Sequence, residues 1–107
     1  MDPGRVEIEF ERIYDEITEQ TENYAKLAEE AAPAEVDYRA AYAAALLSSE
    51  GSSQDKREAE AQVKTEDALF VRRVAEARLA AQKERLASLR TQADMLRTLK
   101  TDMRAAS

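Results

Sequence analysis

Basic side chains in the second half of the chain are the residues best suited to bind something. Arg and Lys neutralise phosphate, and the planar guanidinium group of Arg matches phosphate oxygens well. Arg90, Arg97 and Arg104 repeat every seven residues and therefore share one face of a helix. The candidate contacts to nucleic acid or to a partner protein are Arg72, Arg73, Arg78, Lys83, Arg90, Arg97, Lys100 and Arg104.

The charge of the chain is divided unevenly between its halves. Residues 1–51 carry 13 acidic and 4 basic side chains, whereas residues 52–107 carry 9 acidic and 12 basic ones. One interpretation is internal, with an acidic helix lying beside a basic one. The other is that the basic half meets a polyanion. Charge alone favours the internal interpretation.

Catalytic and metal-binding chemistry has little support in this composition. The sequence contains no His and no Cys, which removes the usual general base, the commonest metal ligand and the reactive thiolate. Carboxylates are abundant, but they lie off the apolar line of the first half, as on a solvated helix face. We therefore expect no enzymatic activity, no cofactor and no bound metal.

These side chains have to be positioned by helices, because helix-forming residues dominate and the sequence has two Gly and two Pro. Apolar residues in the first half follow a seven-residue repeat that predicts a coiled-coil seam. One line of the seam is Phe10, Ile17, Tyr24, Ala31, Tyr38 and Ala45, and the other is Ile13, Gln20, Leu27, Ala34 and Ala41. Tyr14, Tyr24, Tyr38 and Tyr42 lie on or beside it, which favours core or interface roles over base stacking.

A single break is predicted, at Ser49–Ser53. We expect a helix over 4–48, a turn over 49–53 and a second helix over 54–105, with Asp2 capping the first helix. Gly51 is expected to end the first helix in a left-handed conformation, and Ser52 to cap the second. At Pro33 a kinked but continuous helix is preferred over a break, because the seven-residue register survives across it.

The second helix carries its own apolar stripe. It is predicted to run through Val63, Phe70, Val74, Ala77, Ala81, Leu86, Leu89, Ala93, Leu96 and Met103, with a slip of one residue near Ala81–Gln82. Folding the chain at Gly51 pairs residues whose numbers add to about 102. Ile17 then faces Leu86, Ile13 faces Leu89, and Phe70 faces the alanines near Pro33.

The expected architecture is an all-α antiparallel hairpin of coiled-coil type, forming one domain. Its second helix should overhang the first by about two turns, which would leave Arg97–Arg104 without a partner. Two helices bury little surface, so we expect a homodimeric four-helix bundle or a higher oligomer. The predicted core and oligomer residues are Phe10, Ile13, Ile17, Tyr24, Leu27, Tyr38, Phe70, Leu86, Leu89 and Leu96.

Several segments resemble a family of short helical proteins of tailed bacteriophages and prophages, found among replication and recombination genes. The resemblance covers about residues 22–106 and is carried by 38–43 (YRAAYA) with Gly51, 56–59 (KREA), 75–77 (AEA), 83–84 (KE), 89–92 (LRTQ) and 96–99 (LRTL). It implies a small oligomeric accessory protein of phage DNA metabolism. A recombination mediator that contacts single-stranded DNA or a DNA-bound protein would be one example.

The alternative is a structural adaptor or assembly chaperone that holds a partner protein in a helical groove. No apolar run is long enough to cross a membrane, and the first residues lack the layout of a signal peptide. We therefore expect a protein of the host-cell cytoplasm with no membrane partner.

Overall fold

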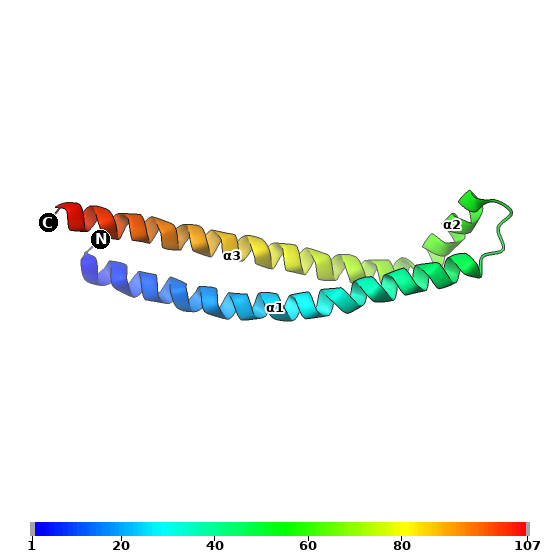
Figure 1. The fold of residues 1–107 in the computed structure, drawn as a ribbon, viewed down its shortest axis with the longest axis horizontal. Coiled ribbons are helices and arrows are strands. Elements are labelled where there is room, and N and C mark those ends of the chain that lie inside the picture. Colours follow the sequence, from blue (N-terminus) through cyan, green and yellow to red (C-terminus); the bar gives the residue numbers. More distant parts are fainter. Residues whose placement is uncertain (1, 107) are drawn as a thin grey trace. The chain divides into compact units, whose positions relative to one another are not determined.

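The computed structural model describes residues 2–106, and helices account for nearly all of them (Figure 1). Helix α1 spans Pro3–Leu47, α2 spans Gln54–Lys64 and α3 spans Glu66–Ala106, with no strand in the described part. The all-α prediction is confirmed. Where α1 and α3 lie side by side they run antiparallel, as in the predicted hairpin.

Contacts within the chain define two compact units. The described residues of Met1–Ala25 and Ala80–Ser107 form one, the terminal unit, and Lys26–Leu79 form the other, the central unit. Each unit is built from one stretch of α1 and one stretch of α3, and the central unit also contains α2.

Helix α1 begins as the sequence predicts. The backbone N–H of Arg5 donates to Oδ1 of Asp2 at 2.8 Å, so Asp2 is the cap and Pro3 takes the first helical position. The helix then continues unbroken through Pro33. Its bounds, Pro3–Leu47, lie one residue before the predicted 4–48 at each end.

Two expectations about the turn are wrong. Gly51 does not adopt a left-handed conformation, since no described glycine has a positive φ. A Cβ at Gly51 would instead lie 2.9 Å from both Lys56 Cβ and the Arg57 nitrogen, so a close approach to α2 is what requires glycine. The cap of α2 is Ser53, whose hydroxyl accepts from the N–H of Lys56, rather than Ser52.

The second half of the chain is also not one helix, because Thr65 separates α2 from α3. The buried Thr65 hydroxyl donates to the Ala61 carbonyl at 2.7 Å, and its backbone departs from helical geometry at φ −113 and ψ 15. The Thr65 carbonyl then accepts the N–H of Leu69 and starts α3. Two acidic residues, Glu66 and Asp67, follow in the first turn, which favours a new helix start here.

The terminal unit has a conventional core. The buried residues are Val6 and Ile13 of α1 and Leu86 and Leu89 of α3. Both helices thus contribute large aliphatic side chains to the seam between them. Ile13, Leu86 and Leu89 are on the apolar lines that the sequence predicts, and Val6 lies one seven-residue repeat before Ile13. Residues of this kind supply most of the stability of a two-helix contact.

A buried polar pair crosses the same seam. Nε2 of Gln82 donates to the backbone oxygen of Gln20 at 2.9 Å and to its Oε1 at 2.8 Å. The residue numbers 20 and 82 add to 102, so the predicted register is confirmed at this layer. Because both glutamines are buried, a shifted register would leave their polar groups unpaired.

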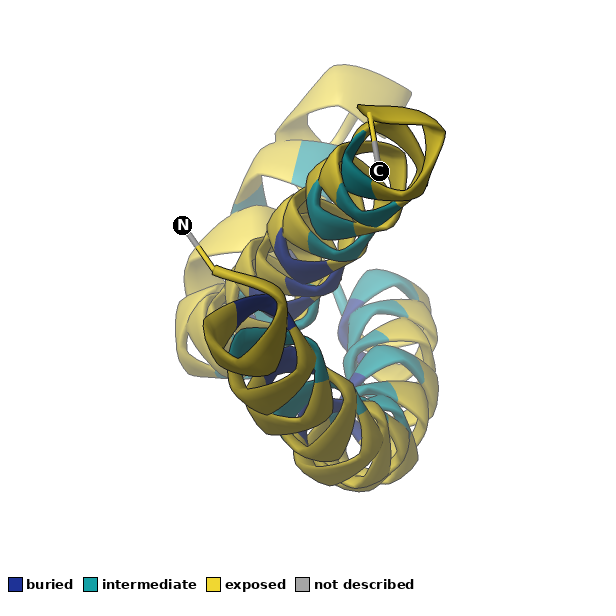
Figure 2. Ribbon diagram, turned by 90° about the vertical axis from the view of Figure 1, so that its left-hand side faces the viewer, coloured by how far each residue is buried: buried dark blue, intermediate teal, exposed yellow. Residues whose placement is uncertain are grey.

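The seam of α3 is more regular than predicted. All but one of its buried and half-buried residues follow alternating intervals of four and three along the helix, without a slip near Gln82. They are Ala68, Arg72, Ala75, Leu79, Gln82, Leu86, Leu89, Ala93, Leu96, Lys100 and Met103, and Leu69 is half-buried beside this line. Figure 2 colours the buried and half-buried positions dark blue and teal among the exposed ones. The helix keeps one register along its whole length, although this brings Arg72 and Gln82 onto the seam.

The central unit buries much smaller side chains. Its buried residues are Ala34 and Ala45 of α1, Ala61 of α2 and Thr65 between α2 and α3. Larger groups lie half-buried around them. Tyr38 and Tyr42 have ring centroids 6.1 Å apart, and the guanidinium carbon of Arg72 lies 5.2 Å from the centroid of the Tyr38 ring.

Candidate interaction surfaces

An exposed apolar patch on α3 is the most unusual surface of the central unit. The side chains of Phe70, Val71 and Val74 are 68%, 57% and 40% exposed. All three line a groove of about 250 Å³ between α1 and α3. Its other lining residues are Glu30, Ala34, Ala75 and Arg78. Contiguous apolar surface of this kind marks an interaction site more often than isolated exposed residues do.

The structure therefore contradicts the placement of Phe70 in the core of the hairpin. Phe70 does share the groove with Ala34, as the predicted match of a large ring with small alanines requires, but it lies at the rim. The reason is the uninterrupted register of α3, which turns Ala68, Arg72 and Ala75 inward and leaves Phe70 on the other side. Val74, Ala77 and Ala81 of α3 are exposed for the same reason, and Val63, which belongs to α2, is also exposed.

A second exposed apolar line runs along α1 in the same unit. Beginning at Pro33, it recurs at alternating intervals of three and four, the spacing of a coiled-coil seam. Its residues are Pro33, Val36, Ala40, Ala43 and Leu47, all exposed and Leu47 by 89%. In this unit α1 and α3 thus each carry apolar residues beyond the seam that joins them.

Four of the eight predicted basic contacts have interaction partners within the chain. Arg72 pairs with Glu76 at 2.9 Å and contacts the Tyr38 ring, while Arg97 pairs with Asp94 at 3.1 Å. Lys100 forms an ion pair with Glu7, and Arg104 also has an interaction partner. Of these, the pair between Lys100 and Glu7 joins α3 to α1 and agrees with the internal interpretation of the uneven charge, whereas the pairs of Arg72 and Arg97 lie within α3.

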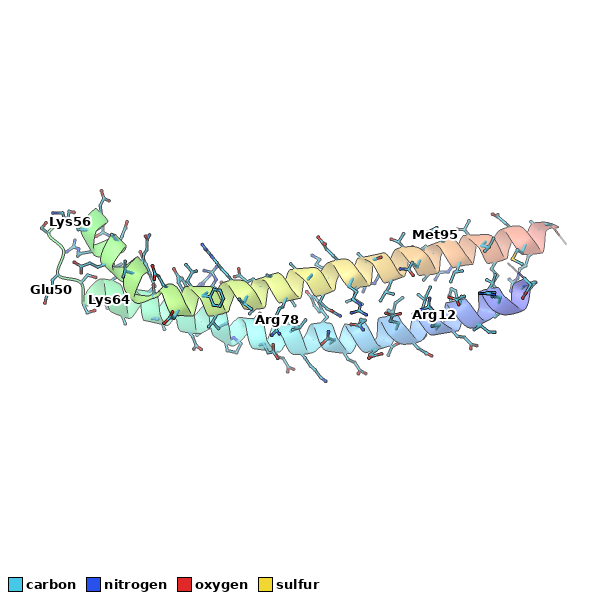
Figure 3. All side chains as sticks on the ribbon, turned by 180° about the vertical axis from the view of Figure 1, so that it is seen from behind. Arg12, Glu50, Lys56, Lys64, Arg78 and Met95 are labelled. Carbon is cyan, nitrogen blue, oxygen red and sulfur yellow. The ribbon has the colours of Figure 1, made fainter. Side chains whose placement is uncertain are left out.

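The remaining predicted basic residues form no ion pair in the described part of the chain. They are Arg73, Arg78, Lys83 and Arg90, all exposed, and they do not form one cluster. Arg73 and Arg78 belong to the central unit, where Arg78 (labelled in Figure 3) lines the apolar groove. Lys83 and Arg90 belong to the terminal unit, seven residues apart and in line with Arg97 and Arg104.

The expected overhang of α3 is wrong. A pocket in the terminal unit joins Pro3, Val6 and Glu7 of α1 with Lys100 and Met103 of α3, so the last turns of α3 lie against the first turns of α1. Because the chain breaks at Thr65, α3 has 41 residues and is no longer than α1, which has 45. An additional ion pair, Arg85 to Glu16 at 3.2 Å, links the helices in this unit.

The other predicted core residues lie on the seam as expected. Ile13, Leu86 and Leu89 are buried. Those that are half-buried are Phe10, Ile17, Tyr24, Leu27, Tyr38 and Leu96. The sequence interpretation missed Val71 and the buried Gln82. Gln82 could have been found by extending the regular spacing of Leu86, Leu89 and Leu96 backwards along α3, and the same spacing leaves Val71 off the seam.

Neither metal-binding nor membrane-spanning features occur in the described residues. No group of three or more acidic side chains in this range is arranged to hold a metal ion. None of the helices combines the length and the apolar composition that crossing a bilayer requires.

The chain was compared with known protein families, curated proteins and solved structures. No family model, no curated protein and no solved structure matches the chain.

Proposed function

We propose that this chain is a non-enzymatic helical adaptor that works by packing a helix of another polypeptide against its central unit. The observation that carries the proposal is the groove lined by Phe70, Val71 and Val74, whose apolar side chains have no cover among the described residues. A helix laid in such a groove with apolar anchors three and four residues apart would bury them.

The composition of the central unit supports the same role. Its fully buried side chains are small, so its internal seam provides little hydrophobic stabilisation. The exposed line that ends at Leu47 offers a second helix-docking face. A region with a weak internal core and apolar outer faces gains stability when another helix covers it.

Photo-crosslinking tests this proposal directly. A photoreactive phenylalanine analogue replaces Phe70 in one variant and Tyr14, which is 63% exposed in the terminal unit, in the control. After irradiation in a lysate of the source cells, we expect crosslinks to polypeptide, a second copy included, to be several-fold more abundant from position 70. Equal yields from both positions would contradict the proposal.

A second candidate function is contact with single-stranded nucleic acid through the terminal unit, as an accessory protein of phage DNA recombination or replication would make. The observation that favours it is the line of Lys83, Arg90, Arg97 and Arg104 at seven-residue spacing. Lys83 and Arg90 on this line have no ion pair in the described chain. The resemblance to phage accessory proteins agrees with either role.

Fluorescence anisotropy with a labelled single-stranded oligonucleotide tests the second candidate. Binding should weaken steeply between about 50 and 200 mM salt, because contacts to phosphate release counterions. The variant with Lys83→Glu and Arg90→Glu should bind more weakly still. Absence of binding at low salt, or binding that salt does not change, would exclude this function.

A further inference from the structure

We infer that the groove of the central unit is occupied by the same groove of a second copy of this chain, in a two-fold symmetric dimer that joins Glu30 of each copy to Arg78 of the other. The inference rests on the proposed function and names the partner. It is carried by the distribution of charge around the apolar patch.

The groove carries one unpaired charge of each sign. Glu30 on α1 and Arg78 on α3 both line it, both are exposed, and neither forms an ion pair in the described chain. An acidic partner would leave Glu30 facing a like charge, and a basic partner would do the same to Arg78. A surface that bears both charges at its edges is complementary to itself.

Two-fold symmetry brings these charges together across the interface. The two-fold axis runs parallel to α1 and α3 and lies between the two copies. Rotation about it lays α1 of one copy antiparallel to α3 of the other, the arrangement of a four-helix bundle. The rotation lays Glu30 of each copy over α3 of the other, on the groove that Arg78 also lines. In the register of Gln20 and Gln82 the two residues are offset by about 9 Å along the helices, so the extended side chains of Arg78 and Glu30 make this contact.

The same rotation matches side-chain volumes. Phe70 and Ala34 line the groove from opposite helices, so Phe70 of each copy comes to lie over the Ala34 region of the other. Neighbouring residues of α1 at positions 31 and 32 are also alanines, which leaves room for an aromatic ring. The large-to-small match that the ring does not complete within one copy is completed between two.

Charge-reversal variants test this arrangement, with mass measured by light scattering and sedimentation. The wild-type chain, 12.0 kDa, should reach twice that mass with rising concentration. Glu30→Arg places two basic groups at each contact and Arg78→Glu places two acidic ones. Each single variant should therefore dimerise at least about fivefold more weakly, while circular dichroism should show unchanged helix content.

The decisive sample is the mixture of the two single variants. In a mixed dimer the arginine at position 30 of one copy meets the glutamate at position 78 of the other, and the two native residues meet at the second contact. We expect the mixture to recover wild-type dimerisation. The inference would be overturned by an oligomer whose formation neither variant weakens. It would also be overturned if mixing the two variants did not restore dimerisation.

Failure of the inference and failure of the proposed function give different results. A wild-type chain that stays monomeric at all concentrations overturns the second-copy inference. If position 70 still crosslinks to a foreign polypeptide more strongly than position 14, the adaptor proposal stands with a different occupant. If neither association nor selective crosslinking occurs, both are wrong.

Discussion

The terminal and central units are built from the same two helices but distribute their apolar residues differently. In the terminal unit Val6, Ile13, Leu86 and Leu89 are buried, although Ile8, Tyr14 and Met95 are exposed there. In the central unit the buried aliphatic residues are alanines, and large apolar side chains such as Phe70 point outward. The same two helices thus bury large aliphatic side chains in one unit and mainly alanines in the other.

The comparison teaches that a regular register takes precedence over local apolarity. Helix α3 carries Leu86 and Leu89 on the same line as Arg72 and Gln82. Turning Phe70 inward would require a slip of the seam between the two units. The polar residues on the seam have partners instead. Gln82 is hydrogen-bonded to Gln20, and Arg72 pairs with Glu76 and contacts the Tyr38 ring.

The largest expected difference between the units is in core truncation. Leu86→Ala should lower the free energy of unfolding by about 2–4 kcal/mol, because it removes a buried side chain and leaves a cavity. Val74→Ala should cost less than about 1 kcal/mol in the monomer. Urea unfolding followed by circular dichroism at low protein concentration measures both, and equal losses would show that the units do not differ in this way.

The next largest effect is expected at the buried pair of Gln20 and Gln82 in the terminal unit. Gln82→Leu leaves the buried side chain of Gln20 without its donor and should cost about 1–3 kcal/mol. The double variant Gln20→Leu with Gln82→Leu should recover most of this loss, because two leucines can pack together on the seam and leave no side-chain polar group unpaired. A double variant no more stable than the single one would mean that the glutamines contribute more than mutual pairing.

The two glycines provide a matched pair, one in each unit. Gly51→Ala should destabilise the chain by about 1–3 kcal/mol, because the added Cβ would lie 2.9 Å from backbone and side-chain atoms of α2. Gly4→Ala should be neutral or stabilise by up to about 1 kcal/mol, because its Cβ would meet Asp2 Oδ1 at an ordinary 3.4 Å. Thermal unfolding of the two variants compares them directly, and a neutral Gly51→Ala would exclude the close approach.

The smallest effect is expected from the surface ion pair between Arg85 and Glu16. The side chain of Arg85 is 55% exposed and that of Glu16 is half-buried, and Glu16 also pairs with Arg12, so Arg85→Gln should cost less than about 1 kcal/mol. The difference from wild type should shrink further as salt rises from about 0.05 to 0.5 M, because exposed charges are screened. A loss as large as that of Leu86→Ala would show that charge, rather than aliphatic packing, holds the terminal unit together.

The sequence predicted the terminal unit better than the central one, for a physical reason. Around Ile13 and Leu86 each helix has a single apolar line, and the period of seven determines which face is buried. Around Phe70 and Val36 each helix has two such lines, and periodicity alone does not tell which one faces the other helix. The break at Thr65 was missed because a buried hydroxyl bonded to the preceding turn has no periodic signature. The acidic residues after it were the available signal.

The candidate site could be predicted only in its parts. The basic residues were identified from the sequence, but their partners Glu7, Glu76 and Asp94 depend on side-chain geometry that spacing does not determine. The groove depends on which line of α3 is exposed, and this follows from the register fixed elsewhere at Gln20 and Gln82.

The contact between the first turns of α1 and the last turns of α3 brings the two ends of the described chain to the same end of the terminal unit. A short Gly/Ser linker could therefore join them, and new ends could be opened in the loop between α1 and α2 near Glu50. Such a circular permutant would keep every helix intact but would remove the covalent link between α1 and α2. Comparing it with the parent chain would show how far the order of the helices along the polypeptide, rather than their packing, governs folding.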